Sequence, residues 1–236
     1  MPDEILRTFI AIELDEPLHI ALRGVQEKLR RQTPPGSVKW VGQDGIHLTL
    51  KFLGDTPAGR IREIEAALEA ACAGFEPFEF TVEGRGCFPN FHRPRVIWVA
   101  VRERSSNLSR IQAAVERTVA PLGWPTEERS FSPHLTLGRV NKGADGYTTA
   151  AVGKAVERTV VEQIGLQRVT AVSLMRSDLR STGAVSIASA VIYDISGLFA
   201  PLAQWGGSMV RKLLCQRGVD WNGKRCPDPE DGGQTE

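Results

Sequence analysis

The sequence has almost no excess charge and no long hydrophobic run. Its 29 Lys and Arg residues nearly balance its 28 Asp and Glu residues, so the net charge is +1. This balance argues against a broad positive surface for duplex DNA or an anionic membrane, but it allows a small basic site for one phosphate. No apolar run approaches the roughly 20 residues that span a bilayer. The acidic start, from Met1 to Glu4, does not resemble a secretory signal, so we expect a cytoplasmic protein with no membrane partner.

Cysteine is also scarce. The four cysteines form no CxxC pair, and no histidine lies near them at zinc-finger spacing. We therefore expect reduced thiols, no metal site and no cofactor. A disulfide between Cys215 and Cys226 stays open as the alternative.

The hydrophobic pattern is that of alternating strands and helices as far as about residue 195. Helical spacing of apolar residues starts after Asp15, again from the breaker run 54–57, and then near 108–119 and 147–159. Strand-like runs lie at 5–14, 38–41, 46–53, 78–87, 95–102, 133–140, 166–176 and 185–195. This order predicts an α+β domain with helices outside a largely antiparallel sheet.

The last 40 residues have a different composition. The segment 197–236 is rich in glycine, has no long period, and holds five basic and five acidic residues. We expect one domain over residues 1–196, built from two interleaved lobes, and a flexible tail over 197–236. Because the net charge of the tail is zero, it is not a basic arm for nucleic acid.

One tetrapeptide, His-Leu-Thr-Leu, occurs twice, at His47–Leu50 and at His134–Leu137. With 4 His and 14 Thr in the chain, two His-x-Thr matches would arise in roughly 2% of shuffled sequences. The repeat therefore indicates a duplicated lobe with pseudo-twofold symmetry.

The spacing within each motif has a chemical meaning. Side chains alternate along a strand, so the His and the Thr of a motif share one face and the two Leu share the other. If the two strands lie side by side, two imidazoles and two hydroxyls meet on one face. One ring can then accept a proton while the other donates one, and the hydroxyls can bind phosphate oxygens, with no metal required. A lone histidine on a strand is more often structural, and two histidines without a nearby carboxylate or thiolate are poor zinc ligands.

The motifs resemble those of the two-histidine (2H) phosphoesterase superfamily. The similarity is closest to its bacterial and archaeal RNA 2′,3′-cyclic phosphodiesterases, also called 2′-5′ RNA ligases. It covers residues 5–196 and rests on seven stretches: 7–12, 38–41, 47–54, 88–90, 93–98, 131–139 and 174–177.

The resemblance implies a fold, an activity and a set of residues. The fold would be two pseudo-symmetric lobes around a central cleft. The activity would be hydrolysis of 2′,3′-cyclic phosphate ends of RNA, or of nucleotides bearing that group, to 2′-phosphates. His47 would donate a proton to the 3′ leaving oxygen, and His134 would accept one from water. Three residues would bind the phosphate: Thr49, Thr136 and Arg139.

Further residues are weaker candidates. Strict alternation puts Arg139 on the face opposite His134 unless Gly138 bends the strand. Arg7, Trp40 and Phe131 could line the cleft, with the aromatic rings stacking on a base, although a core role is equally open for both rings. Alternation also puts Lys51 on the face of His47.

The sequence is compatible with two other functions. One is 2′-5′ RNA ligation, the same chemistry in reverse. The other is a non-catalytic module that binds RNA or nucleotides. Two intact proton-transfer groups disfavour the binding module. We expect a monomer.

Overall fold

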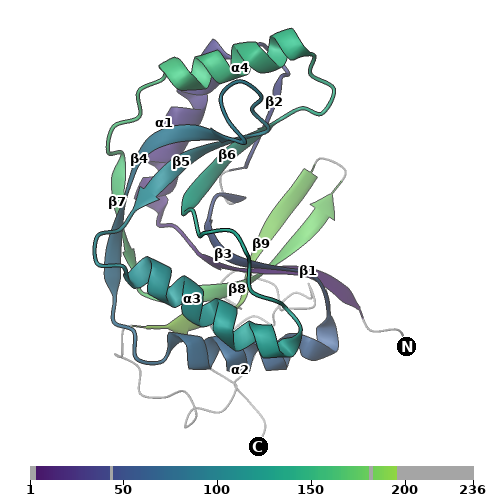
Figure 1. Ribbon diagram of the computed structural model, residues 1–236, viewed down its shortest axis with the longest axis vertical. Coiled ribbons are helices and arrows are strands. Elements are labelled where there is room, and N and C mark those ends of the chain that lie inside the picture. The colour runs from purple at the N-terminus through teal and green to yellow at the C-terminus, as the bar shows by residue number, and fades with distance from the viewer. Residues whose placement is uncertain (1–3, 43–44, 181–182, 196–236) are drawn as a thin grey trace, which may run out of the picture.

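The computed structural model describes residues 4–42, 45–180 and 183–195. The expected tail and the cysteines at 215 and 226 lie outside these residues. The order of elements alternates as the sequence predicts (Figure 1). The strands are β1 (Ile5–Ile12), β2 (Val38–Trp40), β3 (Leu48–Pro57), β4 (Phe78–Phe88), β5 (Val96–Arg102), β6 (His134–Val140), β7 (Gly165–Val169), β8 (Ala171–Arg180) and β9 (Gly183–Asp194). The helices are α1 (Glu16–Gln32), α2 (Ile61–Cys72), α3 (Asn107–Val119) and α4 (Gly146–Arg158).

The strands form one antiparallel sheet in the order β7-β4-β5-β6-β3-β1-β8-β9, and β2 also pairs with β6. The two motif strands, β3 and β6, are the central neighbours of this order, with three further strands beyond each of them. The halves are therefore related by a pseudo-twofold axis between β3 and β6. This confirms the predicted α+β class with two similar lobes.

The helices cover each half in pairs. α1 and α4 contact each other and pack on β7 and β4, whereas α2 and α3 pack together beside β3 and β8. Figure 1 shows the first pair at one end of the molecule and the second pair at the other. Because α1 directly follows β1 but covers the opposite half, the two lobes interleave. No helix among the described residues is long and apolar enough to cross a membrane.

Helix α1 illustrates how local sequence sets these boundaries. The carboxylate of Asp15 accepts a hydrogen bond from the backbone N–H of Leu18 at 3.1 Å, which caps the first turn. Apolar side chains at helical spacing, Leu18, Leu22 and Leu29, are buried on one face. The helix ends at Gln32 because Pro34 and Pro35 cannot continue it.

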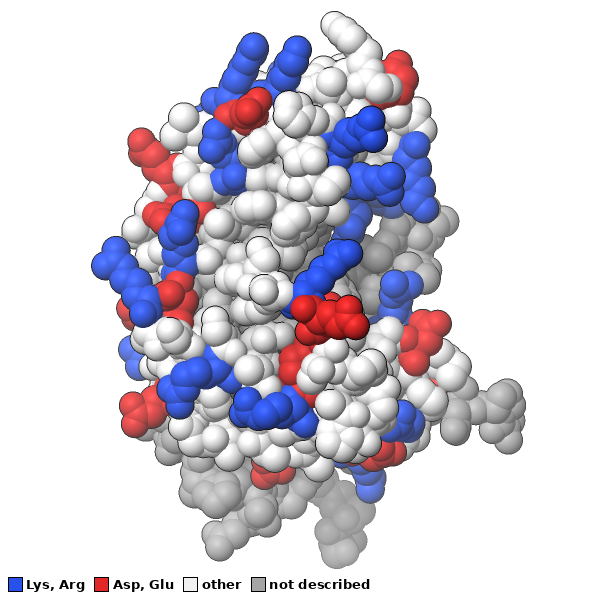
Figure 2. Space-filling model, in the orientation of Figure 1, with Lys and Arg blue, Asp and Glu red and all other residues white. Residues whose placement is uncertain are grey.

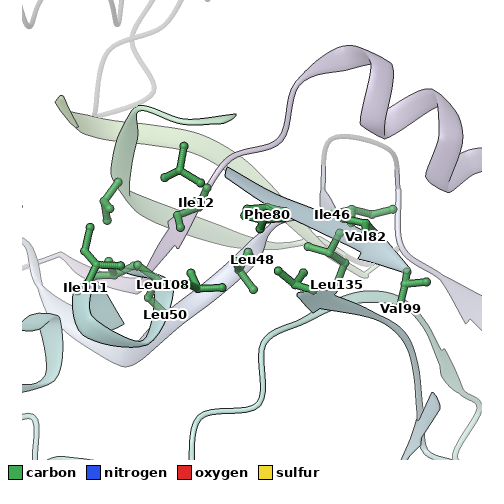
Figure 3. Packing of buried hydrophobic residues seen from close by; sticks show 14 of the residues in the cluster. Ile12, Ile46, Leu48, Leu50, Phe80, Val82, Val99, Leu108, Ile111 and Leu135 are labelled. Carbon is green, nitrogen blue, oxygen red and sulfur yellow. The ribbon is translucent and has the colours of Figure 1, made fainter. Parts of the chain in front are cut away.

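One leucine pair joins the cores of the two halves. Leu48 and Leu135 are Cα partners in the ladder between β3 and β6, and both are fully buried. Figure 3 shows Leu48 between Leu50 and Leu108 on one side and Leu135 and Val99 on the other. The leucines of the motifs thus anchor the strands in the core, as the alternation predicts.

Two predicted boundaries are wrong. The breaker run 54–57 does not open a helix: β3 continues to Pro57, and α2 begins at Ile61 after a 3-10 turn at Ala58–Arg60. The run 166–176 is two strands, because β7 pairs with β4 in one half whereas β8 pairs with β1 in the other. The chain crosses between halves at Thr170, inside an unbroken β-forming sequence.

The two described cysteines are free thiols, as predicted. Cys72 and Cys87 are both buried, and burial raises the pKa of each thiol to about 12. Both thiols therefore stay protonated and act as small apolar core groups.

Candidate active site

The register at the central seam brings the two motifs together. Since Leu48 pairs with Leu135, antiparallel geometry puts His47 opposite Thr136 and Thr49 opposite His134. All four side chains are half-buried, in contrast to the fully buried leucines beside them. Opposite Cβ atoms lie roughly 4.5–5.5 Å apart and diagonal ones roughly 7–8 Å apart. The two imidazoles therefore occupy one diagonal of a small square, and the two hydroxyls occupy the other.

An aromatic ring holds the first imidazole in place. The ring of Phe9 on β1 stacks on that of His47, with centroids 4.6 Å apart and planes 24° apart. Phe9, Ala11 and Met175 form a small buried cluster separate from the main core. This cluster supports His47 from its own half of the sheet.

The second imidazole has an equivalent support from the other half. The ring of Phe88 on β4 meets His134 edge-on at 4.9 Å, and Trp98 on β5 lies 6.2 Å from it. The Trp98 ring packs across Gly86, where a Cβ atom would overlap it. Glycine at this position therefore makes room for the wall behind His134.

A backbone contact fixes the tautomer of His134. Its Nδ1 lies 2.7 Å from the carbonyl oxygen of Ser132. Because a carbonyl can only accept, Nδ1 carries the hydrogen, and the neutral ring keeps its lone pair on Nε2. Gly45 stands two residues before His47 as Ser132 does before His134, but Nδ1 of His47 forms no hydrogen bond with a described residue.

Both histidines are less basic than a free imidazole. Burial lowers the pKa of His47 to about 4; the Gly45 carbonyl opposes this shift, and His19 adds slightly to it. Burial also lowers the pKa of His134; the Ser132 carbonyl raises it, and the charge of Arg139 lowers it further. In the free protein at neutral pH both rings are therefore neutral.

A β-bulge decides where Arg139 points. Thr136 pairs with Trp98, but Gly138 pairs with the next residue of β5, Ile97, so Leu137 is an extra residue in β6. The extra residue reverses the alternation and puts Arg139 on the face of Thr136 and His134. The bend that this arginine requires is thus present at Leu137, one residue before Gly138.

A second bulge corrects the expectation for Lys51. Thr49 pairs with Ala11 and Lys51 pairs with Ile10, so Leu50 is the extra residue in β3. Lys51 therefore faces the core, where its ammonium lies 2.7 Å from the carboxylate of Glu116 and 2.6 Å from the carbonyl of Pro125. It supplies no free charge near His47.

The three other candidates lie in different places. Arg7 is exposed and shares the face of Phe9, two residues further from His47 along β1. Trp40 packs against the main core, and the guanidinium of Arg30 lies 5.7 Å above its ring. Phe131 also packs against the main core. Of these three, alternation along β1 places Arg7 on the face of Phe9.

The sequence analysis assigned no role in the site to several residues that the structure places there. Phe9, Phe88 and Trp98 wall the imidazoles, and Gln26 on α1 donates hydrogen bonds to the carbonyls of Val41 and Leu137, at 2.9 and 2.8 Å. The carbonyl of the bulged Leu137 also accepts a hydrogen bond from the backbone N–H of Val41 at 2.9 Å, so both of its acceptor positions are used. Gln26 thereby links the segment before the first motif to the bulge of the second, and only the three-dimensional register reveals this.

Within residues 4–42, 45–180 and 183–195, no group of three or more His, Cys, Asp and Glu side chains is arranged to hold a metal ion. A pocket of about 1040 Å³ is lined by parts of β4, β5, β7 and the start of α3, and it reaches Pro133, directly before the second motif. None of the predicted site residues lines that pocket.

The fold and the duplicated motif define a class. The chain belongs to the 2′-5′ RNA ligase superfamily, whose family model matches residues 17–180. An RNA 2′,3′-cyclic phosphodiesterase of Methanothermobacter thermautotrophicus is 34% identical over 180 residues, which are 76% of this chain and 94% of that protein. One of Thermotoga maritima is 36% identical over 135 residues, 57% of this chain and 70% of that protein. The crystal structure of TT0787 of Thermus thermophilus superposes with a TM-score of 0.66 at 26% identity, covering 82% of this chain and all of that one.

Proposed function

We propose that this protein hydrolyses 2′,3′-cyclic phosphate ends of RNA to 2′-phosphates by two-histidine acid–base catalysis without a metal ion. The arrangement that carries the proposal is the square of motif side chains, in which the imidazoles share one diagonal and the hydroxyls share the other. Attack and departure at phosphorus occur on opposite sides, so two proton-transfer groups need this diagonal placement. The relatives named as RNA 2′,3′-cyclic phosphodiesterases support the choice of substrate.

Each step has an assigned group. His134, with its lone pair on Nε2, accepts a proton from the water whose oxygen attacks phosphorus. The bond from phosphorus to O3′ breaks, and protonated His47 donates its proton to that oxygen. Thr49, Thr136 and Arg139 hold the non-bridging oxygens, where negative charge increases in the transition state. The product carries a 2′-phosphate and a 3′-hydroxyl, and exchange with water restores both rings.

The direct test is incubation of the protein with an RNA oligonucleotide that ends in a 2′,3′-cyclic phosphate, in excess EDTA. We expect turnover at the rate seen without EDTA, and a 2′-phosphate product identified by phosphorus NMR against authentic 2′- and 3′-phosphate standards. Loss of activity on chelation would contradict the metal-free mechanism. A 3′-phosphate product would mean that O2′, and not O3′, is the leaving oxygen.

The lowered pKa values predict an acid-shifted pH profile. The reactive form has one imidazole protonated and the other neutral, and both free-enzyme pKa values lie below the ordinary 6.5. Above about pH 6.5 the reactive form loses the one proton that its pair of imidazoles carries. The value of kcat/KM should therefore fall about tenfold per pH unit. The bell-shaped profile of kcat/KM should therefore peak on the acid side of pH 6.5. The profile of kcat should lie at higher pH, because the anionic substrate stabilises a protonated ring in the complex. A maximum of kcat/KM above about pH 7 would contradict this account.

A further inference from the structure

Two cations lie directly opposite each other beside the motif. In the ladder between β2 and β6, Lys39 pairs with Arg139, and both side chains are exposed. Val38 and Trp40, on either side of Lys39, face the core. Lys39 therefore points to the other face, the one that the Leu137 bulge gives to Arg139 and Thr136.

The fold gives this pair no counter-charge. Neither the ammonium of Lys39 nor the guanidinium of Arg139 forms a hydrogen bond or an ion pair with any residue that the structure describes. Other cations have such partners: Lys51 binds Glu116, Arg60 binds Glu63, and Arg102 binds Glu83. Like charges opposite each other in a ladder destabilise it. An anionic ligand between the two side chains would offset that cost.

The surface around this place is rich in positive charge. Figure 2 shows Lys and Arg side chains gathered at the upper right, toward the end of the molecule where Figure 1 draws β2 and β6. Acidic side chains are sparse among them in this view. A local basic surface is compatible with the near-neutral whole chain, because the compensating acidic residues lie elsewhere.

The spacing from the motif suits a second phosphate. Arg139 lies two ladder rows from Thr136 once the bulge is passed, and each row adds about 3.3 Å, so the Lys39–Arg139 row is roughly 7 Å along the strand. That length is on the scale of one nucleotide repeat. Resting on the proposed function, in which the long Arg139 side chain reaches back to the cyclic phosphate, we propose that Lys39 on the opposite strand forms a second phosphate subsite, which binds the phosphate on the 5′ side of the nucleotide that carries the cyclic phosphate. Lys39 is thereby a specificity-determining residue that favours chain ends over cyclic mononucleosides.

The test uses three substrates with one terminal nucleoside: the nucleoside 2′,3′-cyclic phosphate, the same compound with a 5′-phosphate, and a dinucleotide that ends in it. In the wild type we expect the added phosphate to raise kcat/KM about tenfold, mainly through KM, as one charge-assisted contact does. Lys39→Gln should remove that gain and leave the phosphate-free substrate unchanged. Lys39→Arg should keep it, and Lys154→Gln, which removes an exposed charge on α4, should behave as the wild type.

Salt dependence gives a second measure. For the dinucleotide, the slope of log kcat/KM against log salt should become shallower by about 0.7 in Lys39→Gln, the change expected for one lost phosphate contact to a single strand. An undiminished 5′-phosphate gain in Lys39→Gln, or an equal loss on all three substrates, would overturn the subsite and leave the proposed hydrolysis standing. A wild-type protein that hydrolyses none of the three substrates would overturn the proposed function and the subsite with it.

Discussion

His134→Gln and His47→Gln should each hydrolyse a 2′,3′-cyclic phosphate about 10³-fold more slowly than the wild type, with the loss in kcat. In the proposed mechanism each imidazole transfers a proton in the transition state, and a transfer of this kind contributes about 10²–10⁴-fold. Glutamine keeps a polar side chain of similar reach but cannot exchange a proton. The double variant should be little slower than either single one, because the two groups act as a unit in one displacement. Steady-state kinetics under saturating substrate measures the effect.

Histidine loss must be separated from damage to the fold. His92→Gln is the matched control, since His92 is exposed on a loop and touches neither motif. It should retain wild-type kcat. Added imidazole should restore part of the activity of His134→Ala, because a free ring can enter the space left beside Phe88. Either motif variant within about tenfold of wild-type kcat would refute acid–base catalysis by these two rings.

Periodicity predicted the centre of the site because the chain is regular there. From His47 to Thr49 and from His134 to Thr136 no bulge intervenes, so residues two apart share a face as alternation requires. One residue further along each strand the rule fails. Leu50 and Leu137 are bulged, and an apolar residue at a bulge looks the same in the sequence as one in a regular strand. This is why Lys51 was assigned to the wrong face, and why the face of Arg139 depended on a bend.

The order of elements was predictable, but their partners were not. Each strand and helix has a local hydrophobic pattern, so the order in which strands and helices follow one another could be predicted from the sequence alone. Pairing depends on contacts between distant segments: β7 and β8 are separated by one residue yet join opposite halves of the sheet. The aromatic walls of the site have the same origin. Phe9, Phe88 and Trp98 come from three different strands, and no short motif unites them with the histidines that they contact.

The motif threonines should matter nearly as much as the histidines. They occupy the second diagonal of the square. In the proposed mechanism this diagonal crosses the line of proton transfer at the phosphorus atom. There each hydroxyl can donate to a non-bridging oxygen, whose charge grows in the transition state. Valine has nearly the same shape without the hydroxyl, so Thr49→Val and Thr136→Val should each lower kcat about 10²-fold, as the loss of one such donor does.

The threonine prediction distinguishes transition-state stabilisation from simple binding. If the hydroxyls act mainly as charge builds up, the loss appears in kcat, and the serine variants at the same positions regain most of it because they restore the donor. Thr126→Val, in an exposed loop, removes a hydroxyl away from the motifs and should leave kcat unchanged. A higher KM with unchanged kcat in Thr49→Val and Thr136→Val would mean that the hydroxyls bind substrate and transition state equally. In that case the two imidazoles and Arg139 would have to account for the chemical step without them.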